Sequence, residues 1–320
     1  MIVIKFHSIM SSRFFQLRCF NIILIVFFLV AGCVRKPVEK EFFIDNPTNE
    51  EIAIQIDNNR IVVNPLSYES VLLSAGKHSF TYLDQNIEFV VKPSDKEVVL
   101  NPTLQPYIYY TDLYIGDGHT ESDRNRFKEK YYSTVKTFDG DSVVVPFKII
   151  DNQLFIEQSN FNWSLRPWNA WAKEISADPK ETGVLHGVPV CKLFRLNDFY
   201  TEIGEMDTEE LKYIIGHLPK KKLSEIEAYT LCNEQFSFDC ESADSVLKEI
   251  KDDFKSLVDM SDQEYHSIHD KLFKKDIRKL YFTDKDCYNV NDSVFFKESR
   301  RLAAKVNELE TMNAFIIKKP

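Results

Sequence analysis

All three tryptophans of the chain fall in one short stretch, at Trp163, Trp168 and Trp171, around Arg166 and Pro167. Indole faces can stack on a sugar ring or a peptide, and a guanidinium can bind a polar group of the same ligand. The same side chains can instead plug the junction between two halves of a chain, because aromatic residues belong more often to a core than to a site. The stretch is the first candidate binding site, and the aromatic plug is the favoured interpretation.

Two other groups of side chains resemble metal ligands. The loop 117–123 alternates acidic and imidazole groups as calcium loops do, but it lacks the glycine and final glutamate of the helix-loop-helix pattern. His266 and His269 lie three apart on an expected helix, without an HExxH motif. We expect a solvated hairpin tip and a hydrogen-bonded histidine at the edge of the core, and no metal or cofactor.

The sequence contains no catalytic motif that we recognise. It has no GxSxG nucleophile elbow, and each cysteine is explained more simply as a disulfide partner than as a nucleophile activated by a histidine. Catalytic groups need only converge in space, so an enzyme is not excluded, although a protein without catalysis is favoured. The run Lys220–Lys222 is expected to be a solvated linker, with a patch for partner docking as the alternative.

The N-terminus has the pattern of an export signal. Residues 1–32 contain three basic and no acidic residues and end in the apolar run Ile22–Val30. A helix needs about 20 apolar residues to span a bilayer, whereas a basic stretch followed by a short apolar core is typical of a secretory signal. Met1 and Met10 would each begin a complete signal. An uncleaved signal anchor is the alternative.

Directly after this run, Val30-Ala31-Gly32-Cys33 resembles the lipobox of bacterial lipoproteins. The resemblance implies cleavage before Cys33 and acylation of Cys33, which would hold the chain on a membrane. Val34, where an aspartate marks inner-membrane retention in part of this class, implies the outer membrane of the cell envelope.

The charge balance excludes one class of partner. The formal net charge of −9 becomes −12 once Lys5, Arg13 and Arg18 leave with the signal. A nucleic-acid-binding protein needs a clustered cationic face, so nucleic acid is not expected as a partner. Attachment to anionic lipid through the protein surface is not expected either, which leaves acylated Cys33 as the membrane contact.

Four cysteines remain for the mature domain: Cys191, Cys232, Cys240 and Cys287. An even number in an oxidising compartment predicts two disulfides, and sequence alone allows three connectivities. We favour Cys232–Cys240, which closes a short loop, together with Cys191–Cys287. A zinc site is the alternative, although no CxxC pair is present.

Residues 41–103 alternate apolar and polar side chains with period two, in short runs separated by turn residues, which predicts an antiparallel sandwich. The segments Ile54–Asp57, Leu73–His78 and Phe89–Val91 resemble PEGA-type surface modules. This resemblance implies a small, non-catalytic β-sandwich. A second group of strands is expected over 107–157, with Asp139-Gly140 as the turn of a hairpin.

The period changes to that of a helix after Met206. Expected helices cover 208–218, 224–232, 242–258, 261–280 and 291–312, and 313–317 is expected to close as a terminal strand. The predicted fold class is therefore α+β, an N-terminal antiparallel β-sandwich region followed by a C-terminal helical domain. The expected divisions are a signal (1–32), a tether (33–40), the sandwich (41–160), a tryptophan-rich connection (161–205) and the helical domain (206–320).

These observations favour a lipid-anchored cell-envelope protein that acts as a binding or assembly module for another envelope protein. The alternatives are an immunity or inhibitor lipoprotein, whose acidic charge would complement a basic toxin or hydrolase, and a hydrolase of envelope polymer. The alternatives share the expected anchor at Cys33 and differ in what the domain binds.

Overall fold

The computed structural model describes residues 39–114, 120–137, 139–171, 188–203, 208–229, 231, 234–258, 271, 278–279, 287 and 292–318. The expected signal, Cys33, Cys232, His266, His269 and residues 117–119 lie outside this set. From Glu39 onward the chain belongs to one compact unit.

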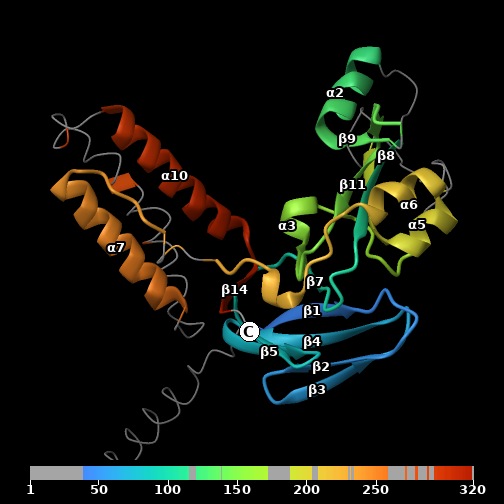
Figure 1. The fold of residues 1–320 in the computed structure, drawn as a ribbon, viewed down its shortest axis with the longest axis horizontal. Coiled ribbons are helices and arrows are strands. Elements are labelled where there is room, and N and C mark those ends of the chain that lie inside the picture. The colour runs from blue at the N-terminus through green and yellow to red at the C-terminus, as the bar shows by residue number, and fades with distance from the viewer. Residues whose placement is uncertain are drawn as a thin grey trace, which may run out of the picture. The chain divides into compact units, whose positions relative to one another are not determined.

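Two sheets form a sandwich (Figure 1). In the first, β1 (Glu39–Asp45) lies between β4 (Tyr68–Ser74), which is antiparallel to it, and β7 (Val98–Leu100), which is parallel to it. The strand β12 (Phe155–Glu157) then pairs with β7. In the second sheet the order is β14 (Ala314–Lys318), β6 (Gln85–Val91), β5 (Gly76–Tyr82), β2 (Ile52–Ile56) and β3 (Asn59–Val63).

The alternation seen in the sequence explains the sandwich core. In β2, Ile52, Ile54 and Ile56 are buried while the residues between them are exposed, because successive side chains point to opposite faces of a strand. Phe42 and Ile44 of β1 reach the same core from the facing sheet. The predicted α+β class, with its N-terminal antiparallel sandwich and C-terminal helices, is confirmed.

A third sheet covers the other face of β1 and β7. It contains β11 (Phe147–Ile150), β8 (Tyr107–Tyr114) and β13 (Val188–Arg195). Phe43 and Val99, which point away from the sandwich core, pack with Tyr107 and Leu193 of this sheet. On the far side of the third sheet, α5 (Leu196–Glu202) and α6 (Thr208–Gly216) supply Phe199 and Leu211 to a further core.

The hairpin predicted at Asp139-Gly140 is confirmed. It joins β9 (Ser133–Lys136) to β10 (Ser142–Val145), and Gly140 has a φ of +83°, a conformation that favours glycine. Ahead of it lies the helix α2 (Glu121–Tyr131), and α3 (Gln158–Phe161) is a single turn after β12.

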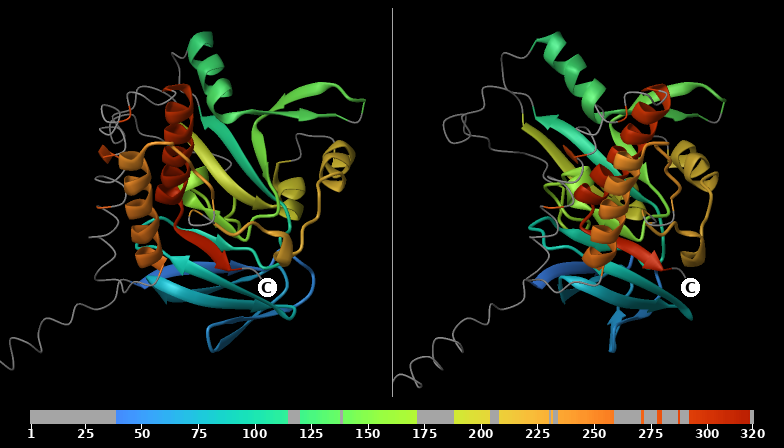
Figure 2. Two further views of the ribbon diagram at one scale, coloured as in Figure 1. Left: turned by 60° about the vertical axis from the view of Figure 1, so that its left-hand side comes forward. Right: turned by 90° about the vertical axis from the view of Figure 1, so that its left-hand side faces the viewer.

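Two long helices, α7 (Glu241–Val258) and α10 (Asp292–Thr311), lie side by side in every view (Figures 1 and 2). Their apolar stripes share a core with Val90 of β6 and Phe315 of β14. Both helices and the terminal strand agree with the predicted ranges. In contrast, the helix expected over 224–232 is wrong: η1 (Leu223–Glu225) is one short turn, and the N–H of Tyr229 donates to the carbonyl of Ile316 (2.7 Å).

The strand directions give the sandwich two distinct ends. At the entry end, where β1 begins, Glu39 lies opposite Ser74, and β5 begins two residues after Ser74. At the far end, Asp45 lies opposite Tyr68, and β7 finishes at Leu100. The connections 101–106 and 151–154 therefore lie at the far end.

Candidate functional site

The structure separates the three tryptophans. Trp163 is buried in the core between the first and third sheets. Trp171 packs on Tyr110 and Phe194, with ring centroids 5.3 and 5.8 Å away, at the core that includes α5 and α6. Trp163 thus lies between two sheets, and Trp171 lies where the third sheet meets α5 and α6.

Arg166 is held in place by a bidentate ion pair. Its Nε donates to both carboxylate oxygens of Glu97 (3.1 and 3.0 Å), and its Nη2 donates to Oε1 (2.5 Å). Burial raises the pKa of Glu97, but the hydrogen bonds from Arg166 and Trp163 lower it by a larger amount. The net pKa of Glu97 is therefore below the ordinary value. The guanidinium also lies over the ring of Phe43, 4.5 Å from its centroid. This arginine is thus a rigid part of a surface.

Trp168 is half-buried and stacks on Tyr68, with ring centroids 3.8 Å apart and an interplanar angle of 14°. Tyr68 is 38% exposed. Leu72 lies four residues further along β4, on the same face of the strand, and is 60% exposed. We call Tyr68, Leu72, Arg166 and Trp168 the aromatic surface. It lies along β4, which is an edge strand of its sheet.

Buried charges connect the layers near this surface. Asp45 is fully buried and accepts hydrogen bonds from Arg195 and from the hydroxyl of Tyr107. Lys192 is fully buried as well; its Nζ donates to both oxygens of Glu202 (3.0 and 2.8 Å) and lies over the ring of Phe194. Because both partners of each pair are held by further contacts, these are structural ion pairs.

Another group of buried charges lies at the entry end. Lys40 of β1 is 5% exposed, and its Nζ has no hydrogen-bond partner among the residues that the structure describes. Burial lowers its pKa to about 8 against the attraction of Glu157 and Asp95. Glu157 accepts from the backbone N–H groups of Asn313 and Ala314 (2.8 Å each). Burial nevertheless raises the pKa of Glu157.

We expect Lys40→Met to raise the free energy of unfolding at pH 7 by about 1–2 kcal/mol, less than the full pKa displacement implies because water screens the group in part. Lys40 binds its proton more weakly in the folded chain than in the unfolded one. Between about pH 8 and 10.5 the unfolded chain therefore holds more protons, and stability rises with pH. The gain in unfolding free energy of Lys40→Met over wild type should be complete below pH 8 and should vanish above about pH 10.5.

Urea titrations at pH 7, 9 and 10.5 measure this difference, with the exposed Lys136→Met as the control. An advantage that grows with pH would contradict the prediction.

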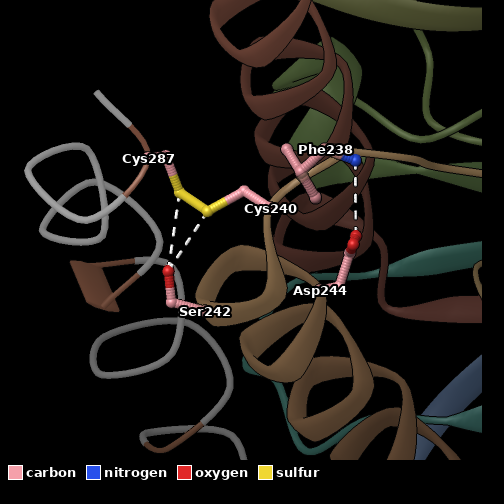
Figure 3. The surroundings of a disulfide bond; sticks show 5 residues. All are labelled: Phe238, Cys240, Ser242, Asp244 and Cys287. Carbon is pink, nitrogen blue, oxygen red and sulfur yellow. Dashed lines mark hydrogen bonds between the residues drawn. A yellow bond between two sulfur atoms is a disulfide. The ribbon is translucent and has the colours of Figure 1, made fainter. Parts of the chain in front are cut away.

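The predicted disulfide pairings are wrong. Cys240 bonds to Cys287, with Cα atoms 5.7 Å apart, and the hydroxyl of Ser242 contacts both sulfurs (Figure 3). Cys191 is a free, buried cysteine in β13. The reason is that Cys191 packs between the first and third sheets whereas Cys287 packs against the helices, so the two belong to different cores.

Asp57 and His78, which belong to the segments that resemble PEGA-type surface modules, are in contact. Asp57 Oδ2 lies 2.8 Å from Nδ1 of His78, and the N–H of Ser79 donates to Asp57 Oδ1 (2.9 Å). Burial raises the pKa of Asp57, but these bonds outweigh it and the net pKa is lowered. The pair fixes the turn after β2 against β5.

Metal-binding groups of three or more histidine, cysteine or acidic side chains do not occur among the residues that the structure describes. In the same set, no helix is both long and apolar enough to cross a membrane. Comparisons with family models, curated proteins and solved structures found no match to this chain.

Sequence reasoning missed Tyr68 and Leu72 as parts of a surface and Lys40 as a buried charge. For Lys40 a signal was present, because the period of two in β1 places it on the same face as Phe42 and Ile44. Tyr68 and Leu72 gave no such signal, since only the fold brings Trp168 over β4.

Proposed function

We propose that this chain is a lipid-anchored protein of the cell envelope that binds a partner protein, without catalysis, through the aromatic surface. The lipobox-like sequence ending at Cys33 supports the anchor. The aromatic surface supports the binding role, and it is the observation on which the proposal rests.

The composition of the aromatic surface is that of an interface hot spot. Tryptophan, tyrosine and arginine contribute most of the binding energy in many protein interfaces. Here Arg166 is fixed by Glu97, and Trp168 by Tyr68 and Phe43. Little side-chain entropy would be lost on binding, because the groups are already ordered. The exposed Leu72 adds apolar area beside them.

The anchor would limit where the domain can lie. Five residues separate Cys33 from Glu39, the first residue of β1, and a chain of this length reaches at most about 20 Å. The entry end of the sandwich would therefore lie close to the membrane. The aromatic surface runs along β4 from that end toward Tyr68 at the far end.

The other functions considered from the sequence find less support. For a hydrolase, two carboxylates lie beside the tryptophans, and both are already engaged. Glu97 is bound by Arg166 and Trp163 and has a lowered pKa, so it suits neither a general acid nor a free base. Glu202 is bound by Lys192 and by the backbone N–H of Trp171. An immunity protein would use the same kind of surface, and the identity of the partner would distinguish it.

The test compares the lipidated full chain with two lysine variants of equal exposure. Leu72→Lys alters the aromatic surface and places a cation opposite Glu41, which the sheet tolerates. Val144→Lys, at a position 61% exposed in β10, is the matched control. After cross-linking in native envelopes, we expect one partner with wild type and the control, and a loss of about tenfold or more with Leu72→Lys.

A Cys33→Ser chain should leave the membrane fraction in the same experiment. The proposal is overturned if no partner is cross-linked by wild type, or if Leu72→Lys retains the partner as well as Val144→Lys does.

A further inference from the structure

A cleft of about 570 Å³ opens at the far end of the sandwich, and none of its lining residues belongs to the aromatic surface. Five segments form it: the connections 103–106 and 151–152, the helices α5 and α6, and the linker 218–221. Asn152, at φ +52°, joins two of them, because its Nδ2 donates to the carbonyl of Pro219 (2.5 Å) and its Oδ1 accepts from the N–H of Lys221 (2.8 Å). The cleft is therefore built by specific contacts between turns.

The charged side chains that line this cleft are mainly cationic. Lys212, Lys220 and Lys221 face a single acidic lining residue, Asp151. Lys212 is paired with Glu209 (2.8 Å), whereas Lys220 and Lys221 make no ion pair with any described residue. In a chain with 49 acidic and 40 basic residues, an excess of unpaired lysines at one cleft favours an anionic ligand.

A buried hydroxyl in the cleft gives a second, independent observation. Tyr200 of α5 lines the cleft, and its hydroxyl is buried without a hydrogen-bond partner in the described part of the chain. Folded proteins rarely leave such a group unsatisfied, because doing so costs free energy. Burial, and to a lesser extent Glu209, raises the pKa of Tyr200, so the group remains a proton donor at neutral pH.

The remaining wall of the cleft is largely apolar. Leu104, Leu196, Ile215 and Leu218 line it, and its volume is in the range typical of small-molecule sites. An apolar wall with lysines among its lining residues suits a ligand that has an apolar body and one charged head.

We propose that this cleft binds a small amphiphilic anion. Its carboxylate or phosphate head would be held by Lys220 and Lys221 with a hydrogen bond from Tyr200, and its apolar body would lie on the leucines and Ile215. This site is separate from the aromatic surface and does not depend on the partner proposed above.

Titration calorimetry on residues 33–320 carrying Cys33→Ser tests the site, with octanoate, octyl phosphate and the neutral octanol as probes. We expect one of the anions to bind, and octanol to bind at least about tenfold more weakly. Octanoate and octyl phosphate together distinguish a carboxylate from a phosphate head.

Three variants then locate the site. Lys220→Gln with Lys221→Gln removes the cations, and Lys222→Gln, an exposed neighbour that does not line the cleft, is the matched control. Gly216→Leu adds a bulky side chain at a residue that lines the cleft, where a Cβ meets no atom within 4 Å. Tyr200→Phe removes only the hydroxyl.

The double lysine variant, Gly216→Leu and Tyr200→Phe should each weaken binding of the anion, the first two by about tenfold or more, while Lys222→Gln leaves it unchanged. The proposal is overturned if neither anion binds wild type, if octanol binds as well as the anions, or if the double lysine variant binds like Lys222→Gln. The lysine comparison still decides if Gly216→Leu does not fold.

Discussion

Replacing Arg195 with methionine is expected to lower the free energy of unfolding by about 3–5 kcal/mol. The reason is that Asp45, which is 0% exposed, would lose its main partner in the core. The same change removes the hydrogen bond from Nη1 of Arg195 to the carbonyl of Leu66 (2.7 Å). Urea unfolding followed by circular dichroism measures the loss.

A double-mutant cycle provides the sharpest control. Asp45→Leu combined with Arg195→Met removes both charges, and we expect it to recover much of the stability, since two apolar residues replace a buried pair at little cost. Arg166→Met, which breaks a partly exposed pair, should cost only about 1 kcal/mol. An Arg195→Met chain as stable as Arg166→Met would contradict our view of the buried pair.

Removing the Cys240–Cys287 bond by alanine at both positions should lower the free energy of unfolding by about 3–4 kcal/mol, because the bond spans 47 residues and limits the unfolded chain. Guanidinium unfolding with and without a thiol reductant measures the effect. Wild type should lose stability on reduction, whereas the double variant should not respond.

Cys191→Ala is the matched control for this experiment, since Cys191 is buried but unbonded. It should retain the full response to reductant. Mass mapping under denaturing, non-reducing conditions should find Cys191 alkylated and Cys240 and Cys287 protected. A Cys191→Ala chain that no longer responds to reductant would mean that the pairing described here is wrong.

Local patterns predicted most of the strands and the two long helices. The isoleucines of β2 and the Asp139-Gly140 turn gave strong signals because a period of two and a left-handed glycine are local properties. The segment 224–232 misled because tertiary contacts override local apolar spacing: in its described part, the N–H of Tyr229 bonds to Ile316 of β14.

Long-range relations were harder to predict. The disulfide pairing was missed because proximity in sequence favoured Cys232 for Cys240, whereas the packing of α7 brings Cys287 to it. For the tryptophan stretch, the sequence indicated an aromatic region but not which core each tryptophan contacts or how deeply each is buried. Trp163 is buried in a core, whereas Trp168 and Trp171 are partly buried at the edges of two different cores, because Tyr68 and Tyr110 from distant strands fix their positions.

The pairing of β14 with β6 has a consequence for the order of folding during synthesis. The edge of β6 that accepts Ala314–Ile316 remains open until residues far later in the sequence have been synthesised. The same late residues complete the core under α7 and α10 through Phe315. A chain that still lacks these residues therefore exposes an unpaired strand edge and apolar surface, and both features favour aggregation until β14 is in place.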